Sequence, residues 1–150
     1  AWRRELDRLA PAFETVPTHR LIHGDAVATN VILGPDGLPR LIDFEWSGPG
    51  DTAKDLALIG GRVTGGPWYL PMTPDDVTAF VTEYSRYSRC SRLAQDSSAT
   101  DPQRLLERRD AYELLDRLGN LLYCLSRPGE ARYGRWADEL ARSLTARLGG

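Results

Sequence analysis

Two aspartates and one asparagine stand at spacings that suit a specific chemistry. Asp25 ends the run His-Gly-Asp, Asn30 comes five residues later, and Asp43 opens the run Asp-Phe-Glu-Trp. A transferred phosphoryl group needs a carboxylate that orients the attacking hydroxyl, and hard oxygen ligands that hold Mg²⁺ on the phosphates. Asp25 suits the first role, and the oxygens of Asn30 and Asp43 suit the second. The three residues therefore favour phosphoryl transfer.

Short apolar runs on both sides of these residues predict the strands that position them. Residues 21–22 precede His-Gly-Asp, and residues 31–33 and 38–42 flank the turn sequence Gly-Pro-Asp-Gly at 34–37. An apolar run, a Gly/Pro turn and a second apolar run are typical of a β-hairpin, here with arms of about four residues. The three polar side chains then lie on loops bounded by strands.

The rest of the chain is predicted to be mainly helical. Apolar residues at three- and four-residue steps, together with capping signals, predict helices at 2–14 and 51–59 and helices that begin near 74 and 102. A last helix is predicted to hold Trp136, Leu140, Leu144 and Leu148. Breaks are expected at Pro17, at Gly60–Gly61 and at Pro128–Gly129. Residues 85–100 are rich in Ser and Arg, which predicts a surface connection. We expect one domain over residues 1–150, with a small β element first and helices after it.

The helix predicted from Pro102 combines an apolar stripe with alternating charges. The stripe consists of Leu105, Tyr112, Leu115, Leu118, Leu122 and Leu125. Asp110, Glu113 and Asp116 would suit an acidic lip for a cationic substrate. They alternate with Arg108, Arg109 and Arg117, which favours a solvated helix face instead. Trp68, Tyr69 and Tyr84 would suit a substrate site, but aromatic residues at such spacings are more often core, and we favour the core.

Composition excludes several classes of partner. The chain has 150 residues, a net charge of −2 and 41% hydrophobic residues, which gives no electrostatic basis for binding nucleic acid or an anionic membrane. No stretch approaches the ~18 apolar residues of a membrane span, and the first residues lack the apolar core of a signal peptide. Cys90 and Cys124 form no CxxC pattern, which is typical of idle thiols in a reducing cytosol. The sequence therefore predicts a cytoplasmic location.

The polar motifs resemble those of a known family. His-Gly-Asp, four residues, Asn and then Asp-Phe-Glu-Trp is similar to the phosphotransferase family that includes aminoglycoside phosphotransferases and choline kinases. Protein kinases use His-Arg-Asp, four residues, Asn and then Asp-Phe-Gly for the same parts. Residues 50–57, Gly-Asp-Thr-Ala-Lys-Asp-Leu-Ala, resemble a further segment of the family. The motifs cover residues 21–57.

The resemblance implies an α+β, mainly α fold, namely the C-terminal lobe of a protein-kinase-like fold with a small β-hairpin carrying the catalytic loop. It implies that Asp25 is the catalytic base, and that Asn30 and Asp43 bind Mg²⁺ and through it the nucleotide. His23 would brace the loop, and Asp55 would tie its helix to the catalytic-loop backbone. ATP and Mg²⁺ are the implied cofactors, and the implied partner is a small-molecule hydroxyl acceptor. GTP in place of ATP stays open.

Two features differ from the family pattern. Residues 26–29 are Ala-Val-Ala-Thr, which makes a smaller loop than the family usually has. Residues 1–22 lack a Gly-rich phosphate-covering loop, and Lys54, the only lysine, follows the catalytic segment. We therefore expect that this chain lacks the nucleotide-clamping N-terminal lobe and is weak or inactive on its own.

The sequence leaves the acceptor and the class of protein open to several alternatives. The acceptor is an aminoglycoside-like antibiotic, a choline-like amine, a sugar or an amino alcohol. A different class of protein, a non-catalytic binding or scaffold module that retains a kinase lobe, is less favoured because such a module needs none of Asp25, Asn30 and Asp43. An unrelated metal-dependent hydrolase is weaker still, because the sequence has no second cluster of metal ligands and only two histidines.

Overall fold

The computed structural model describes residues 2–14, 20–90 and 101–149, and most of these residues are helical. The α-helices are α1 (Trp2–Leu9), α2 (Thr52–Leu58), α3 (Pro74–Cys90), α4 (Pro102–Leu125) and α5 (Ala131–Gly149). Short 3₁₀ turns occur at η1 (Ala10–Phe13), η2 (Ala28–Asn30) and η3 (Phe44–Trp46). The described part of the chain is thus mainly α with small sheets, in agreement with the expected class.

Three small two-stranded sheets account for the described strands. β1 (Arg20–Ile22) pairs antiparallel with β4 (Gly48–Gly50), and β2 (Val31–Leu33) pairs antiparallel with β3 (Pro39–Leu41). β5 (Gly60–Gly61) and β6 (Leu70–Pro71) pair in parallel. The predicted hairpin is confirmed as β2–β3, with arms of three residues, and Gly37 adopts a positive φ of 75° in its turn.

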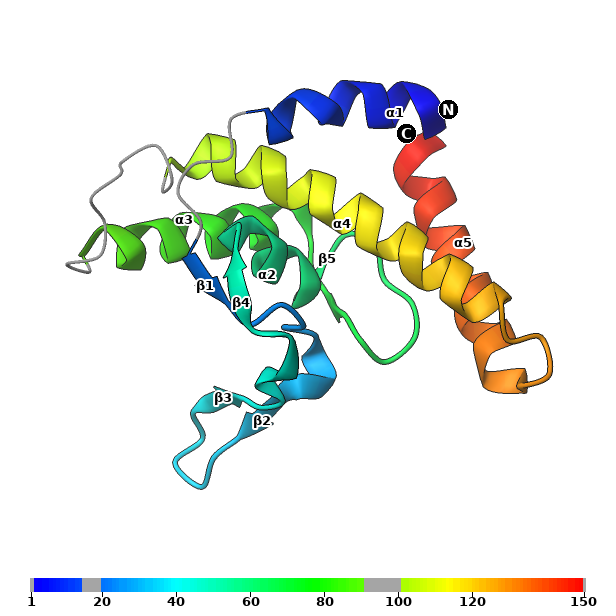
Figure 1. Cartoon of the computed structure of the whole chain (residues 1–150), viewed down its shortest axis with the longest axis horizontal. Helices are drawn as coiled ribbons and strands as arrows, with labels where there is room; N and C mark the ends of the chain where they lie inside the picture. Colours follow the sequence, from blue (N-terminus) through cyan, green and yellow to red (C-terminus); the bar gives the residue numbers. More distant parts are fainter. Residues whose placement is uncertain (1, 15–19, 91–100, 150) are drawn as a thin grey trace.

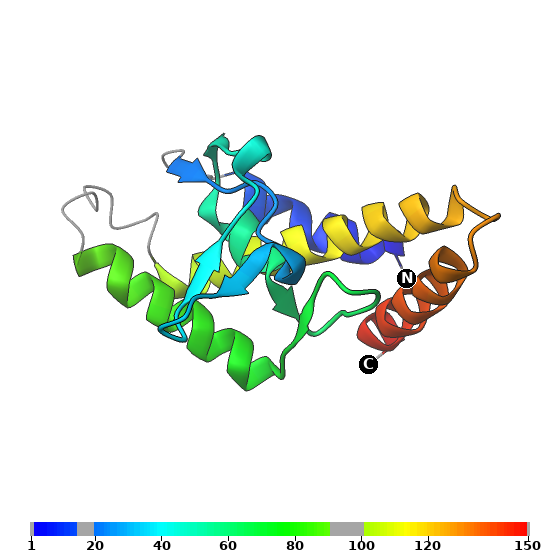
Figure 2. The same ribbon diagram turned by 90° about the horizontal axis from the view of Figure 1, so that it is seen from below.

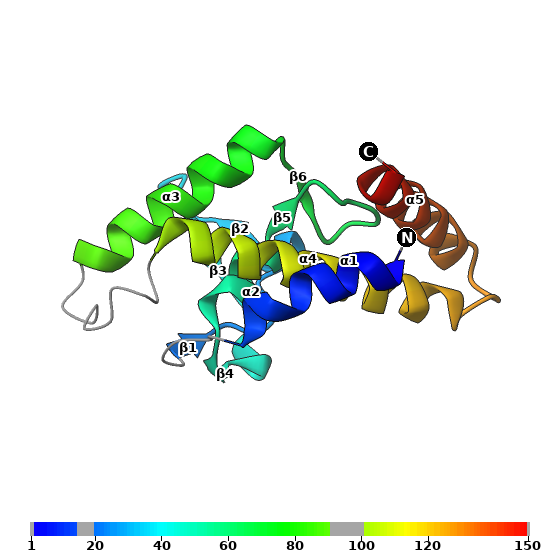
Figure 3. The ribbon, with the colours of Figure 1, turned by 90° about the horizontal axis from the view of Figure 1, so that it is seen from above.

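Helix α4 is the centre of the helical part, because it packs against each of the other four α-helices. α3 lies beside its N-terminal half and α5 beside its C-terminal half (Figure 1, Figure 2). α1 runs along α4 when the molecule is seen from above (Figure 3). The β2–β3 hairpin projects away from the helices (Figure 1). No helix among the described residues is long and apolar enough to cross a membrane.

The helix starts follow the capping signals of the sequence. Asp51 accepts a hydrogen bond from the Ala53 amide at the start of α2, and Asp101 accepts one from the Arg104 amide at the start of α4. Thr73 and Asp76 bond each other's backbone amides before α3, which is a capping box. These side chains satisfy amides that a helix start leaves without partners.

The core forms three clusters around α4. The largest joins Ala26 and Val27 of the predicted catalytic loop to Tyr69, and to Leu140 of α5. Trp68 packs against this cluster, and Tyr84 of α3 packs against another. The prediction that these aromatic residues belong to the core is confirmed. The core therefore reaches the middle of the predicted catalytic loop.

The structure corrects two predictions about connections. Residues 85–90 are the last part of α3 and not a surface connection, and Ser85 is fully buried; residues 91–100 of the predicted connection lie outside the described residues, as does Pro17. Gly60–Gly61 does more than close a helix, because it forms β5. An added Cβ at Gly60 would lie 2.3 Å from the Leu70 carbonyl oxygen, so glycine permits this strand pairing.

The predicted faces of α4 are also corrected. Arg108, Arg109 and Arg117 are no more than 2% exposed, so they do not lie on a solvated face. In contrast, three leucines of the predicted apolar stripe are at least 46% exposed: Leu115, Leu122 and Leu125. The buried arginines have partners that lie more than 45 residues away in the sequence, which explains why local patterning misplaced them.

Candidate functional site

The predicted catalytic loop begins with a glycine that the local geometry requires. Gly24 follows β1 with a φ of 83°, a conformation that residues with a Cβ adopt only at a cost. An added Cβ would also lie 2.2 Å from the carbonyl oxygen of Trp46. The turn into the loop therefore needs both the backbone freedom and the small size of glycine.

Asp55 of α2 holds the backbone of this turn. Its Oδ2 accepts a hydrogen bond from the His23 amide at 2.7 Å, and its Oδ1 accepts one from the Gly24 amide at 2.9 Å. Both carboxylate oxygens thus bind consecutive backbone amides, in the short range that charge-assisted hydrogen bonds favour. Asp55 links the loop to the first turn of α2.

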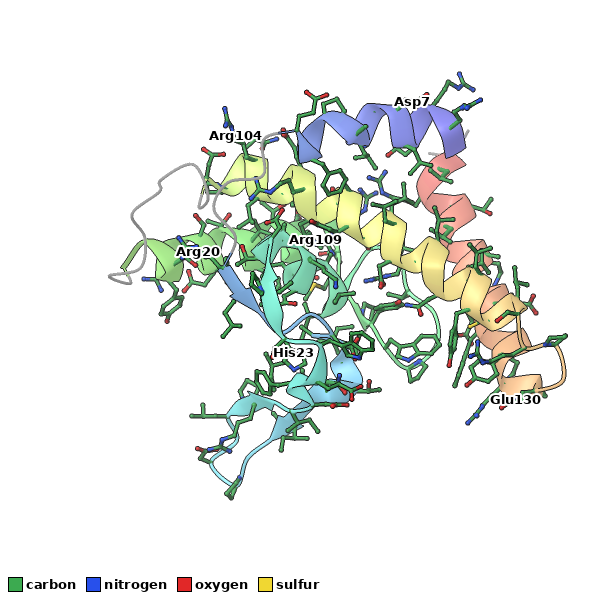
Figure 4. All side chains as sticks on the ribbon, viewed as in Figure 1. Asp7, Arg20, His23, Arg104, Arg109 and Glu130 are labelled. Atoms are coloured by element: carbon green, nitrogen blue, oxygen red, sulfur yellow. The ribbon has the colours of Figure 1, made fainter. Side chains whose placement is uncertain are left out.

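The imidazole of His23 connects the loop to the end of the hairpin. His23 is 4% exposed, and its Nε2 lies 2.9 Å from the carbonyl oxygen of Ile42. The Asp25 amide donates to Nδ1 at 3.3 Å, which makes Nε2 the protonated ring nitrogen that donates to Ile42. The ring of Phe44 packs on the imidazole, with centroids 4.5 Å apart. Figure 4 places His23 at the junction between the helices and the hairpin.

Asn30 binds Asp25 directly. Its Nδ2 donates to the backbone carbonyl of Asp25 at 2.9 Å and to the Asp25 Oδ2 at 2.9 Å. The η2 turn makes this return possible, because the Asn30 amide donates to the Val27 carbonyl. The four residues between Asp25 and Asn30 therefore close a loop in which one side chain orients the other.

The hairpin brings Asp43 back to Asn30. Val31 pairs with Leu41, and one step further the Ile42 amide donates to the Asn30 carbonyl at 2.9 Å. Asp43 then has a φ of 65° and is the only non-glycine residue of the described part with a positive φ. A left-handed aspartate at the end of a strand is the type of backbone outlier that clusters at functional sites. The structure thus brings the sequence-predicted residues Asp25, Asn30 and Asp43 to the same end of the hairpin.

The middle of the loop has an anchor that the sequence analysis missed. The Ala28 amide donates to the carbonyl oxygen of Trp68 at 2.7 Å, and the neighbouring Ala26 and Val27 are buried. The small Ala-Val-Ala-Thr loop therefore packs into the core instead of standing free. Every residue has a backbone carbonyl, so no residue type or spacing in the sequence could predict this contact.

The donor atoms at this end of the hairpin fit Mg²⁺. The Asn30 Nδ2 is used on Asp25, which leaves the hard Oδ1 oxygen for a cation, and Asp43 supplies a carboxylate. No group of three or more His, Cys, Asp or Glu side chains in the described part of the chain is arranged to hold a metal ion. Mg²⁺ usually takes one or two carboxylates and completes its shell with water and substrate phosphates.

Asp51, the first aspartate of the segment at residues 50–57, has a structural role. Asp51 caps α2 and accepts a hydrogen bond from the buried Arg108 at 2.8 Å.

Two surface hollows of about 500 and 550 Å³ lie away from the candidate site. The first lies between α1 and α4, and the second lies between residues 64–71 and α5. Neither is lined by Asp25, Asn30 or Asp43.

Comparison with known proteins gives a family match. The model of the phosphotransferase enzyme family matches residues 1–93. The chain belongs to this family. Thiamine kinases of Salmonella paratyphi B, Salmonella newport and Salmonella paratyphi C are each 28% identical to it over 148 residues. The match covers 95% of this chain and 46% of each relative, so this member of the phosphotransferase family spans about half the length of the curated relatives it matches.

Proposed function

We propose that this chain is the catalytic-loop lobe of a small-molecule kinase, which transfers the γ-phosphoryl group of ATP to a hydroxyl of its acceptor. The observation that carries the proposal is the double hydrogen bond from Asn30 Nδ2 to the carbonyl and Oδ2 of Asp25. Family membership and the relatives named thiamine kinases support it. Phosphoryl transfer is mostly a matter of positioning and charge stabilisation, and a loop tied at both ends serves positioning.

Asp25 is the proposed catalytic base. Its Oδ2 is held by Asn30, so the carboxylate has one oriented oxygen, and Oδ1 is the oxygen we assign to the incoming hydroxyl. Asp25 is half-buried, which lets an acceptor reach the carboxylate while the backbone around it stays fixed. In this role Asp25 orients the hydroxyl and accepts its proton.

Asn30 Oδ1 and the Asp43 carboxylate are the proposed ligands for Mg²⁺ and, through it, for the nucleotide. When bound, the ion neutralises charge on the β- and γ-phosphates. Asn30 would then serve both halves of the site, with Nδ2 on the base and Oδ1 toward the metal. His23 and Asp55 are proposed as structural supports, because one connects the loop to Ile42 and the other to α2.

We further propose that a separate nucleotide-clamping lobe completes the site. Apolar side chains are exposed around the hairpin and β1: Leu21 is 81%, Leu33 73% and Trp46 69% exposed. Exposed apolar surface of this kind marks a site of contact with other protein. A lobe that carries the phosphate-binding lysine would cover it, and this chain alone would then be a weak or inactive kinase that forms one domain.

The proposed acceptors are aminoglycoside-like molecules or amino alcohols. Thiamine is the first compound to test, because the relatives are named thiamine kinases. It shares with the other candidates a hydroxyl group on a molecule that carries a positive charge.

A thermal-shift titration with Mg²⁺·ATP tests the metal half of the site, because a ligand that binds the folded state raises its apparent stability. The variants are Asp43→Ala and, as a matched control on the same hairpin, Asp36→Ala, whose carboxylate pairs with Arg40 at the exposed turn. We expect a Mg²⁺-dependent shift in the parent and in Asp36→Ala but not in Asp43→Ala. Equal shifts in both variants would count against Asp43 as a ligand.

Phosphoryl transfer itself is tested in a longer chain that includes the upstream lobe. Thiamine, choline, an aminoglycoside and an amino alcohol are compared as acceptors by the formation of ADP and of the phosphorylated product. Turnover with one of them supports the proposal. Mg²⁺·ATP binding without turnover on any acceptor would favour the non-catalytic binding module instead.

A further inference from the structure

Three charged side chains form a buried stripe along α4. Arg109, Glu113 and Arg117 follow each other at steps of four residues, which places them on one face of the helix. Arg109 and Arg117 are 0% exposed and Glu113 is 3% exposed. Buried charges persist only when they have partners, and these partners belong mostly to one segment of backbone.

That segment is residues 57–63, which connects α2 to the loop before Trp68. Arg117 donates through Nη2 to the Ala57 carbonyl at 2.9 Å and through Nε to the Val63 carbonyl at 3.0 Å. Arg109 donates through Nη2 to the Gly60 carbonyl at 2.5 Å, and Glu113 accepts from the Val63 amide at 2.8 Å. The stripe therefore provides hydrogen-bond partners for backbone amides and carbonyls that are not paired within a helix or a long strand.

Arg117 also holds the next part of the chain. Its guanidinium carbon lies 3.3 Å from the centroid of the Tyr69 ring, and its Nη1 donates to Asp116. The Tyr69 hydroxyl donates to the same carboxylate at 2.7 Å. Burial, reinforced by the Asp116 carboxylate, raises the pKa of Tyr69. Contacts at both the ring face and the hydroxyl therefore hold Tyr69 in place. Tyr69 follows Trp68, whose carbonyl accepts the hydrogen bond from the Ala28 amide.

The proposed catalytic loop is hydrogen-bonded to residues on both sides of the segment 57–63, whose carbonyls Arg117 binds. On one side, Asp55 holds the His23 and Gly24 amides, and Ala57, two residues later, is an Arg117 partner. On the other side, the Trp68 carbonyl holds the Ala28 amide, and its neighbour Tyr69 stacks on Arg117. One guanidinium thus contacts a residue close to each support: Ala57, two residues after Asp55, and Tyr69, next to Trp68.

We propose that Arg117 is a positioning residue for the catalytic loop, which keeps the Asp55 and Trp68 anchors at a fixed separation and so holds the loop between Asp25 and Asn30 in shape. Its catalytic consequence rests on the proposed function, whereas its effect on the loop does not. Arginine suits this role because its planar fork serves several acceptors at once and stacks on an aromatic ring.

The test is amide hydrogen exchange of the 150-residue chain, followed residue by residue by NMR. The variants are Arg117→Lys, which keeps the charge but serves fewer acceptors, and Arg117→Met, which removes the charge. The control is Leu9→Ala, a core variant on α1 whose side chain is 7% exposed. Global stability is measured for each protein, so that exchange through complete unfolding is separated from local opening.

We expect Arg117→Lys to raise the exchange rate of the Ala28 amide by about tenfold or more beyond the change that its global stability accounts for. The amide proton shifts of Ala28 and Gly24 should move as well, and Leu9→Ala should change neither quantity beyond the global effect. The proposal is overturned if Ala28 and Gly24 in Arg117→Lys follow global stability as they do in the control. If Arg117→Met does not fold, Arg117→Lys alone decides. Neither readout needs turnover, so the result is independent of whether the chain proves to be a kinase.

Discussion

Asp51 and Arg108 form an ion pair in the interior of the helical part. The Arg108 Nε lies 2.8 Å from the Asp51 Oδ2, and the side chains are 2% and 4% exposed, respectively. Asp51 also caps α2 through the Ala53 amide. The pair therefore connects the start of α2 to α4, and Asp55, which accepts hydrogen bonds from the His23 and Gly24 amides, lies one turn further along α2.

Arg108→Met should destabilise the fold strongly, because it leaves the Asp51 carboxylate buried without its cation. Removing one partner of a buried pair costs about 3–5 kcal/mol. Urea denaturation measures the change in the free energy of unfolding. The control is Arg86→Met, which breaks the exposed ion pair of Arg86 with Glu83. The loss there should be far smaller, because water screens an exposed pair. Similar losses in the two variants would contradict the structural role of the buried pair.

Gly24→Ala should be more damaging than Gly37→Ala, although both glycines have a positive φ. At Gly37, with φ at 75°, an added Cβ meets nothing within 4 Å, so only the backbone strain of about 1–2 kcal/mol applies. At Gly24 the Cβ would lie 2.2 Å from a backbone carbonyl, and the loop or η3 must move. The difference between the two variants in thermal unfolding isolates the steric effect. Equal destabilisation in the two variants would show that the backbone at Trp46 moves away from the added Cβ without loss of stability.

Asp55→Asn should weaken the anchor of the loop while keeping the size of the side chain. Asparagine has one acceptor oxygen, so one of the His23 and Gly24 amides would face an NH₂ group. An unsatisfied donor costs about 1–3 kcal/mol, which urea denaturation would detect. Asp7→Asn on the exposed face of α1 is the control and should change stability by less than about 0.5 kcal/mol. An unchanged free energy of unfolding in Asp55→Asn would contradict the anchor role.

The sequence predicted the hairpin and the starts of α2, α3 and α4, because their signals are local. Asp101 caps the helix that begins at the next residue, and Gly37 lies inside the turn that it permits. The return of Asn30 to Asp25 spans five residues. Such contacts are made between residues close together in the chain, so the sequence itself contains the pattern that predicts them.

The polar face of α4 was not predictable in the same way. Alternating charges on a helix indicate solvent in the absence of other information, and Arg109 and Arg117 alternate with acidic residues. Their partners are the carbonyls of Gly60 and Val63, 49 and 54 residues away, and carbonyls have no sequence signature. Burying this polar face leaves apolar side chains such as Leu122 on the outside. For Arg109 and Arg117 the error therefore has one cause, a backbone segment that needs hydrogen-bond donors from a distant helix.

Tyr69→Phe should change how stability depends on alkaline pH. Burial raises the pKa of Tyr69 in the folded state above its ordinary value of 10.0, so the folded state holds the phenol proton more tightly than the unfolded state. Stability from this proton is complete below pH 10.0 and is lost as the pH rises past it, by about 1.4 kcal/mol per pH unit. Phenylalanine cannot titrate, and Tyr69→Phe should lose less stability than the parent between about pH 10 and pH 11. Parallel pH profiles in urea denaturation would argue against a buried neutral phenol at this position.

Asp25→Asn and Asp43→Ala should separate the two halves of the proposed site in a longer chain that includes the proposed nucleotide-clamping lobe. Asp25→Asn removes the proposed base but keeps the shape of the side chain, and turnover should fall by about 10²–10⁴-fold with nucleotide affinity nearly unchanged. Asp43→Ala removes a proposed metal ligand, and Mg²⁺-dependent nucleotide binding should be lost. Steady-state kinetics and calorimetry of Mg²⁺·ATP binding measure the two effects, with Asp36→Ala as the control for a carboxylate on the same hairpin. Retained turnover in Asp25→Asn would exclude Asp25 as the base, because the amide of asparagine cannot accept the proton of the hydroxyl.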